Sequence, residues 1–541
     1  MFPTLKTHLT SLEKSAVKHP SAAALKIPHW EEDGVFCGWK TIRFSQFLND
    51  VENAARYWAN ELLQRGIKER DIVGVWVKGV SYLDAVQIWG IARAGYIPQL
   101  ISLRLTHLDV VYDVLKLAGA RAIIFDSTVL QTMGADIVAL PVVDTRSMSL
   151  EHLPLPQLWI PSEQSDIVMI YHSSGTTSGR PKIVPLTARW VDHAIESVEP
   201  IFRGLEGQQV VASHGSFCHI AAAMSLMGCH DLGHCVILSK DIPPSPAELK
   251  SMVNEYGLTV LFLFSSFLSK SLQEARSDPE LLRSLQSIPS VLHGGLALNP
   301  DDATWARAND LYLKDVFAST EVGLMMFGVG GSGSDAGYLQ PPPGVTYRFV
   351  PASGSSTEDP SGNTGPGEQL LELLVPSESR NCPHESLRDK ETGNFHTGDL
   401  FVEPIPGHFL SRGRNDDWIK MEISLRCDTK SIEGNVMELC GKDLVSTAVC
   451  LGTGRPSPAL LVEPLQENDG NDYSALKEEI VRRIRPFHER MYTHERIEDP
   501  RFIITCPKGS LPRTSKGEFQ EQSWRKFMRR LSMKFMLGSK V

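Results

Sequence analysis

The sequence predicts an α/β fold built on mostly parallel sheets that are covered by helices. Short apolar stretches with strand character alternate along the chain with longer amphipathic stretches, and this alternation is typical of parallel sheets. With 541 residues the chain is long for a single core, so two or more domains are expected. Hydrophobic residues make up 42% and charged residues 22%, a composition typical of a globular protein.

Each expected element follows from a local pattern. A helix is predicted after residue 44, because apolar side chains fall on one face at Phe47, Val51, Ala54, Ala55 and Trp58. Amphipathic patterns predict further helices over residues 81–94 and 473–484. Short apolar runs predict strands at residues 71–77, 120–126, 166–171, 258–263, 290–292, 368–375, 445–451 and 459–462. Ligands of such sheets usually bind beyond the carboxyl ends of the strands.

Charge and cysteine content exclude several function classes. The net charge of −10, from 54 basic and 64 acidic residues, gives no footprint for a nucleic-acid partner. No apolar run approaches the roughly 20 residues that span a bilayer, and the start of the chain lacks the apolar core of a signal peptide, so no membrane partner is expected. The nine cysteines are scattered without a Cys-x-x-Cys pair, which predicts reduced thiols in a cytoplasmic protein.

Residues 171–182 (Tyr-His-Ser-Ser-Gly-Thr-Thr-Ser-Gly-Arg-Pro-Lys) are the stretch richest in chemistry. They follow an expected strand, and a strand that runs into a Gly/Ser/Thr loop can wrap phosphate with amide hydrogens, hydroxyls and a lysine. An ordinary surface loop explains the composition equally well, and the common P-loop spacing is absent. The candidate phosphate contacts are Ser174, Gly175, Thr176, Thr177 and Lys182.

This stretch resembles the signature loop of the adenylate-forming superfamily, which includes acyl-CoA synthetases, luciferases and the adenylation domains of peptide synthetases. That loop commonly reads Ser-Gly-Thr-Thr-Gly-x-Pro-Lys, and Ser178 makes the loop of this chain one residue longer. Four further stretches resemble motifs of the same superfamily, in the same order along the chain. The resemblance covers most of residues 40–520.

Two of these stretches lie in the middle of the chain. Gly294 and Gly295 follow an expected strand and resemble the family's Gly-Gly-Ala-type loop beside the adenine. Residues 317–321, which end in Thr320 and Glu321, resemble the Tyr-Gly-x-Thr-Glu motif. The resemblance implies that the carboxylate binds Mg²⁺ and that the hydroxyl reaches the α-phosphate. The ordinary explanation of a Thr-Glu pair is the start of a helix.

The remaining motifs concern the ribose and a hinge. Asp399, expected at a strand end, matches the family's Thr-Gly-Asp and can accept hydrogen bonds from both ribose hydroxyls. Residues 412–420 match the hinge motif, which implies a nucleotide contact by Arg414 and a pivot at Asp416. The wording of residues 416–422 (Asp-Asp-Trp-Ile-Lys-Met-Glu) resembles fungal synthetase-like carboxylic acid reductases.

The resemblance predicts two domains, an N-terminal AMP-binding domain over residues 1–414 and a small α+β lid over residues 415–541 that moves about Asp416. Near the end of the lid, the family usually reads Pro-x-Thr-x-x-Gly-Lys, and its lysine grips the substrate carboxylate and the α-phosphate. Strict alignment places Glu518 at that position. Lys516, two residues earlier, is the residue expected to take this role.

The candidate pocket for the acid is aromatic. Its predicted lining residues are Phe217, His219, Phe267 and Phe317. Cys218 stands where peptide-synthetase domains carry the aspartate that binds an α-ammonium group, so an α-amino acid is not expected. An apolar or aryl acid fits these residue types better. A histidine buried for structural reasons explains His219 equally well.

Taken together, the resemblance implies an adenylate-forming ligase that uses ATP and Mg²⁺. A small carboxylic acid would be converted into acyl-AMP with release of pyrophosphate, and the acyl group would pass to a thiol of CoA or of the phosphopantetheine on a carrier protein, in secondary metabolism. Acid–amine ligation without a thioester is one alternative. A degenerate nucleotide-binding protein is another, which Ser178, Glu518 and the absence of the usual glycine after the hinge would favour.

Overall fold

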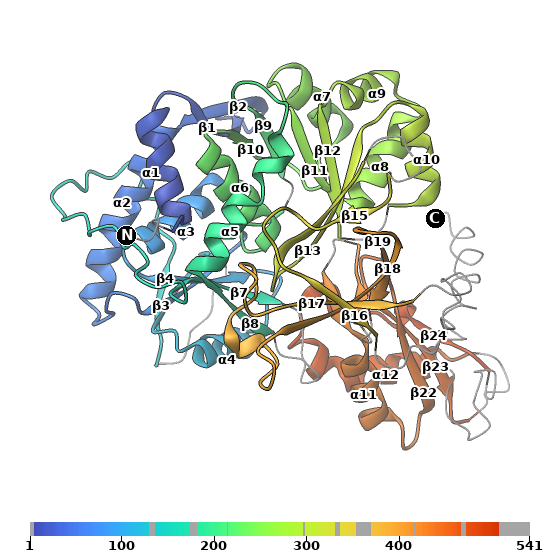
Figure 1. Cartoon of the computed structure of the whole chain (residues 1–541). Coiled ribbons are helices and arrows are strands. Elements are labelled where there is room, and N and C mark those ends of the chain that lie inside the picture. The colour runs from blue at the N-terminus through green and yellow to red at the C-terminus, as the bar shows by residue number, and fades with distance from the viewer. Residues whose placement is uncertain are drawn as a thin grey trace. The chain divides into compact units, whose positions relative to one another are not determined.

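The computed structural model describes residues 5–128, 136–173, 181–213, 215–295, 298–330, 336–352, 369–414, 418–422, 425–466 and 472–507. These residues form two compact units, and Figure 1 labels most of their elements. Unit 1 takes in the described residues of 1–173, 181–348 and 375–396, and unit 2 takes in those of 349–374 and 397–541. The expected domain boundary between residues 414 and 415 stays a prediction.

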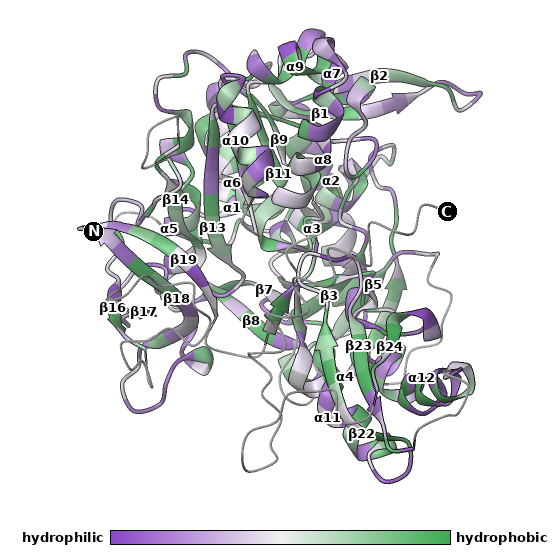
Figure 2. Ribbon diagram, turned by 90° about the vertical axis from the view of Figure 1, so that its right-hand side faces the viewer, coloured by the Kyte–Doolittle hydropathy of each residue, from purple (hydrophilic) through white to green (hydrophobic). Residues whose placement is uncertain are grey.

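One sheet of unit 1 has six strands in the order β6-β5-β3-β4-β7-β8. Its strands are β3 (Ile72–Val77), β4 (Ile97–Ser102), β5 (Ala122–Phe125), β6 (Val138–Pro141), β7 (Ile167–Ser173) and β8 (Lys182–Thr187). Neighbouring strands are parallel except for β7 and β8, which form an antiparallel hairpin. Strands β3 and β5 are almost wholly apolar, as their colour in Figure 2 shows, because parallel strands are buried on both faces.

A second sheet of unit 1 runs in the order β2-β1-β10-β9-β11-β12-β13-β14-β15. Its strands are β1 (Ala23–Trp30), β2 (Phe36–Arg43), β9 (Val210–Ser213), β10 (Cys235–Ile237), β11 (Val260–Phe264), β12 (Ser290–Gly294), β13 (Leu313–Ser319), β14 (Gly323–Gly328) and β15 (Leu339–Gln340). From β1 to β13 the neighbours are parallel, and β2, β14 and β15 are antiparallel additions.

Helices join and cover these two sheets. They are α1 (His8–Lys18), α2 (Phe44–Leu63), α3 (Tyr82–Arg93), α4 (Leu108–Ala118), α5 (Ala188–Glu196), α6 (Ile220–Leu232), α7 (Pro246–Asn254), α8 (Ser265–Ala275), α9 (Pro279–Gln286) and α10 (Pro300–Ala308), with short 3₁₀ turns at Glu199–Phe202 and Glu385–Leu387. One continuous core includes Val75 of β3, Trp58 of α2, Trp89 of α3, Leu226 of α6 and Val260 of β11. Helices α2, α3 and α6 therefore share one core with both sheets.

Unit 2 contains its own core. The strands that lie wholly or partly in unit 2 are β16 (Arg348–Pro351), β17 (Leu371–Val375), β18 (Phe395–Ile405), β19 (His408–Arg414), β20 (Trp418–Lys420), β21 (Arg426–Asp428), β22 (Val445–Leu451), β23 (Ala459–Pro464) and β24 (Ile503–Thr505). Helices α11 (Thr429–Cys440) and α12 (Ser474–His488) accompany them, with 3₁₀ turns at Thr493–Glu495 and Pro500–Phe502. Ile432 of α11, Leu460 of β23 and Ile484 of α12 meet in one hydrophobic cluster.

The structure confirms the predicted class, an α/β fold with mostly parallel sheets in its larger part and a smaller α+β part. Each predicted strand and helix is present, with ends shifted by a few residues. Helix α3, for example, begins after Ser81, whose side chain accepts a hydrogen bond from the Asp84 amide in a capping box. Within the described residues, no helix is both long enough and apolar enough to span a membrane.

Candidate functional site

The β7–β8 hairpin holds the two ends of the candidate phosphate loop together. Ser173 ends β7, Lys182 begins β8, and the two residues are paired across the hairpin. Lys182 is half-buried, and its ammonium lies 5.8 Å from the centre of the Phe395 ring. The strand predicted before the loop is therefore present and ends where the Gly/Ser/Thr stretch begins.

The two glycines predicted beside the adenine lie at the carboxyl end of β12. Gly294 is level with Val316 of the neighbouring parallel strand β13. A Cβ atom at Gly294 would overlap the carbonyl oxygen of Val316, so only glycine fits at this close approach of two backbones. Gly295 follows with a φ of +91°, a conformation that side chains disfavour.

Thr320 and Glu321 form the turn of the β13–β14 hairpin, so the alternative that they begin a helix is wrong. The Glu321 side chain is buried, with 4% of the residue exposed. Its backbone carbonyl accepts a hydrogen bond from the Trp190 indole at 3.1 Å, and the Ser319 hydroxyl accepts one from the Val322 amide at 3.2 Å. Trp190, which sequence reasoning missed, therefore anchors this turn on α5.

A second long-range hydrogen bond joins β7 to the segment that precedes α6. The Tyr171 hydroxyl donates a hydrogen bond to the carbonyl of Phe217 at 3.1 Å, and the amide of Phe217 donates to the carbonyl of Gly79 at 2.6 Å. The Phe217 ring packs edge-on against Trp89 inside the core and is 3% exposed. These bonds fix the start of α6 beside the ends of β3 and β7.

The structure brings His219 and Phe267 together through a residue that was not predicted, Phe264. The Phe264 ring meets the His219 ring edge-on at 6.1 Å and the Phe267 ring at 5.7 Å. Phe264 is the last residue of β11, and this place at the carboxyl end of a parallel strand could have identified it. Phe317 lies on β13, opposite Met326 of β14.

His219 caps α6 and is neutral at pH 7. Its Nδ1 atom accepts a hydrogen bond from the Ala221 amide at 3.3 Å. Burial and the positive charge of Arg104 lower the pKa of His219 to about 4. Its neighbour Cys218 is buried and its thiol lies 3.6 Å from the Val77 carbonyl, and burial raises the pKa of that thiol to about 12. Neither side chain therefore supplies a negative charge for an ammonium group.

In unit 2, the two predicted ribose contacts are neighbours across a sheet. Asp399 of β18 is paired with Arg414 of β19. The prediction that Asp399 ends a strand is wrong, because β18 continues to Ile405. Gly398, with a φ of +70°, bends the strand instead, and the Thr397 hydroxyl accepts a hydrogen bond from the Asp399 amide at 3.0 Å.

The structure does not describe the remaining residues that were predicted to contact the substrates or to act as the hinge. Outside the described residues lie Ser174, Gly175, Thr176, Thr177, Asp416, Lys516 and the side chain of Arg414. Among the residues that the structure describes, no group of three or more His, Cys, Asp or Glu side chains could hold a metal ion. Magnesium sites often use only one or two protein carboxylates together with substrate phosphates, so they need no such group.

Two protein-family models match this chain. The family described as AMP-binding enzyme matches residues 12–365, and the AMP-binding enzyme C-terminal domain matches residues 416–530. An AMP-binding domain-containing enzyme, iboA of Amanita muscaria, is 34% identical over 520 residues, which cover 94% of this chain and 98% of that protein. The chain belongs to the AMP-binding enzyme family, that is, to the adenylate-forming enzymes that its motifs resemble.

Three more distant matches are an acyl-CoA ligase, a reductase and a CoA synthetase of known structure. The 3-hydroxybenzoate–CoA ligase of Aromatoleum is 23% identical, over 83% of this chain and 84% of that enzyme. The adenylate-forming reductase Nps10 of Heterobasidion annosum is 24% identical, and the match covers 94% of this chain but only 47% of the reductase. The o-succinylbenzoate CoA synthetase of Bacillus subtilis shares the fold, with a TM-score of 0.70 at 15% identity over 95% of this chain and 97% of that one.

Proposed function

We propose that the protein activates a carboxylic acid with Mg·ATP and passes the acyl group to a thiol. A carboxylate oxygen would attack the α-phosphorus, the bond to the β-phosphate oxygen would break, and acyl-AMP and pyrophosphate would form. The observation that supports this most is the arrangement within unit 1. The β7–β8 hairpin, the glycines of β12 and the β13–β14 turn lie at strand ends, and the turn is anchored on α5, the helix that follows β8.

We propose the following role for each residue of the site. Lys182, together with Ser174, Thr176 and Thr177, would hold the leaving phosphates. Thr320 would contact the α-phosphate and Glu321 would help to hold Mg²⁺, which supplies positive charge where negative charge develops. Asp399 and Arg414 would bind the ribose, and Lys516 would bridge the carboxylate and the α-phosphate. A swing of the C-terminal region about Asp416 would then admit the acceptor.

We propose an aryl or apolar acid as the substrate. The rings of His219, Phe264 and Phe267 pack against one another, and this aromatic group would suit an apolar ligand. The Cys218 thiol is neutral and faces the Val77 carbonyl, so it supplies no charge for an α-ammonium group. The relative that acts as a 3-hydroxybenzoate–CoA ligase supports an aryl acid and CoA as the first pair to test.

The experiment is pyrophosphate release from Mg·ATP with a panel of aryl, fatty and amino acids, with hydroxylamine present to trap acyl-AMP. Release that depends on aryl acids is the expected result. A Lys182→Ala variant serves as the control, because it removes a proposed phosphate contact without touching the acid. A preference for charged aliphatic acids would contradict the aromatic site. ATP binding without release for any acid would favour the degenerate nucleotide-binding protein.

The acceptor is tested in a second step. With the preferred acid in hand, CoA, a phosphopantetheine thiol and simple amines replace hydroxylamine one at a time. A thioester as the fastest product is expected. An amide formed at a comparable or higher rate than any thioester would establish acid–amine ligation instead.

A further inference from the structure

A pair of polar side chains lies at the base of the β7–β8 hairpin and has no assigned role. His172 is the second-last residue of β7, and Gln99 lies in the middle of the neighbouring strand β4. The two strands are paired at Gln99 and Ile170. Beyond that pair, the His172 imidazole contacts β4, with Nδ1 3.0 Å from the Leu100 carbonyl oxygen and Nε2 3.0 Å from the Gln99 amide nitrogen.

The partners of the ring determine its tautomer. The Leu100 carbonyl only accepts hydrogen bonds, so Nδ1 carries the proton. The Gln99 amide nitrogen only donates, and its other hydrogen goes to the Val114 carbonyl at 3.0 Å, which fixes the orientation of the amide. Nε2 therefore accepts from Gln99. A protonated Nε2 of His172 would face the N–H of the Gln99 amide, and two donors cannot form a hydrogen bond. Burial also lowers the pKa of His172 to about 4, so the ring is neutral at pH 7.

This bridge fixes the position of the residues that follow. Gln99 is fully buried, so its amide cannot move without breaking into the packed interior. His172 pairs with Ile183 and Ser173 pairs with Lys182 across the hairpin. A change in the separation of β4 and β7 at His172 would therefore be transmitted directly to Lys182.

We propose that His172, held by Gln99, is a positioning residue that sets Lys182 and the end of the β7–β8 hairpin for contact with the leaving phosphates of ATP. This inference rests on the proposed function, because it takes Lys182 as a phosphate contact. His172 itself touches no substrate in this account. His172 acts only through the position of Lys182 at the end of the hairpin. Loss of His172 should therefore weaken the binding of ligands that carry β- and γ-phosphates and leave the binding of ligands without them unchanged.

The test compares the affinities for ATP and for AMP, measured by calorimetry on folded protein. His172→Ala removes both bonds and is expected to raise the Kd for ATP at least about tenfold, since small errors in placement are costly. AMP lacks the leaving phosphates, so its Kd is expected to change by less than about twofold. His172→Asn retains an amide that can donate to Leu100, and Gln99→Met removes the other bond. Both are expected to fall between the wild type and His172→Ala.

A control variant is His8→Ala. His8 lies in α1, is buried, and packs edge-on against Trp89 at 5.2 Å. A merely structural role of His172 would make the two alanine variants alike, with a lower Tm and unchanged affinities. Equal loss of ATP and AMP affinity in His172→Ala, or wild-type affinity for both, would overturn the positioning role.

The experiments distinguish failure of the positioning inference from failure of the proposed function. If the wild-type protein makes acyl-AMP while His172→Ala binds ATP as well as the wild type does, the positioning inference is wrong and the proposed function stands. If the wild type binds AMP and ATP but releases no pyrophosphate with any acid, adenylation is refuted, and the ATP-to-AMP comparison still tests the placement of Lys182. A wild type that binds neither nucleotide would refute both.

Discussion

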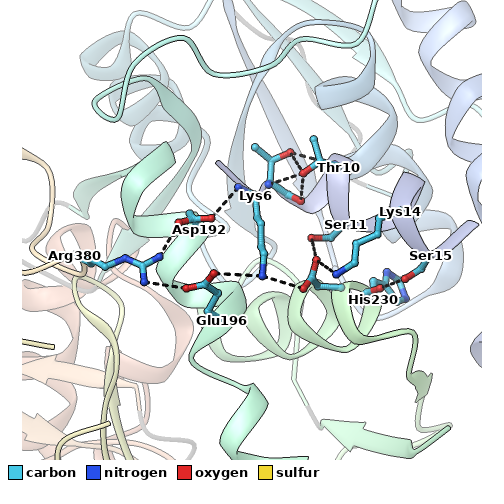
Figure 3. A network of polar contacts seen from close by, with 11 residues as sticks. Lys6, Thr10, Ser11, Lys14, Ser15, Asp192, Glu196, His230 and Arg380 are labelled. Carbon is cyan, nitrogen blue, oxygen red and sulfur yellow. Dashed lines mark hydrogen bonds and ion pairs between the residues drawn. The ribbon is translucent and has the colours of Figure 1, made fainter. Parts of the chain in front are cut away.

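Asp231, at the end of α6, offers a perturbation whose size can be worked out from its contacts. Its carboxylate accepts hydrogen bonds from the Ser11 hydroxyl at 3.1 Å, from Lys14 at 3.0 Å and from Lys6 at 3.3 Å. Figure 3 shows Lys6 reaching from the N-terminal segment toward Glu196 of α5 in the same network. The network thus ties the start of the chain to α5 and α6.

The Asp231→Asn variant keeps the size of the side chain and removes its charge. Hydrogen bonds to charged groups contribute about 1.5–3 kcal/mol, but the Lys6 and Lys14 side chains are 34% and 40% exposed, so solvent screens part of this. We therefore expect a loss of about 1–2 kcal/mol in the unfolding free energy of unit 1. The control Glu196→Gln, at a side chain that is 39% exposed, should cost less than about 0.5 kcal/mol.

The stabilising effect of Asp231 depends on pH, because only the charged carboxylate attracts the two lysines. Burial by itself would raise the pKa of Asp231, but Lys14 and Lys6 outweigh it and hold that pKa below its ordinary value of 3.8. The carboxylate therefore stabilises the fold above pH 3.8, and this contribution is lost as the pH falls through the lower pKa of the folded state.

The assay is urea unfolding followed by tryptophan fluorescence, to which eight tryptophans of unit 1, including the buried Trp58 and Trp89, and the two other tryptophans of the chain contribute. The transition of unit 1 is followed by itself, because a chain with two compact units need not unfold in one step. It is compared at pH 7 and in acid below the lowered pKa of Asp231. The gap between wild type and Asp231→Asn should be present at pH 7 and should close in acid. Equal midpoints at pH 7, or a gap that persists in acid, would refute the reasoning.

Three further predictions concern the proposed site. Glu321→Gln should lower kcat for pyrophosphate release by about 10²–10³ with little change in Tm, because a charge that holds Mg²⁺ is lost; full activity at ordinary magnesium concentrations would remove this residue from the site. Gly294→Ala should cost about 1–3 kcal/mol in urea unfolding, because its Cβ overlaps the Val316 carbonyl; a stability equal to wild type would contradict the close approach. Phe264→Ala should raise the KM for the preferred aryl acid at least about tenfold and leave the KM for ATP unchanged, and the reverse pattern would move Phe264 out of the acid site.

The sequence predicted local elements well, because their patterns are local. The apolar run before Ser173 predicted β7, and the amphipathic stretch after Ser81 predicted α3 with its capping residue. The glycine pair at 294 and 295 was also placed correctly at a strand end. These features depend on residues within a few positions of one another.

The contacts that organise the site could not be predicted in this way. Trp190 meets the Glu321 carbonyl across 131 positions, and Tyr171 meets Phe217 across 46. The order of the strands in a parallel sheet depends on where the crossover helices pack, which no local pattern encodes. Asp399 does not end a strand, because Gly398, with a φ of +70°, bends β18 without ending it.

The most direct test of adenylation measures whether a carboxylate oxygen of the acid is transferred to AMP. The preferred acid is labelled with ¹⁸O in its carboxylate, and turnover is run with Mg·ATP and hydroxylamine, after which the nucleotide and the phosphate products are analysed by mass spectrometry. Attack on the α-phosphorus leaves one labelled oxygen in AMP and none in pyrophosphate, which is the result that this account predicts. Label in inorganic phosphate together with ADP would show attack on the γ-phosphorus, and it would contradict adenylation.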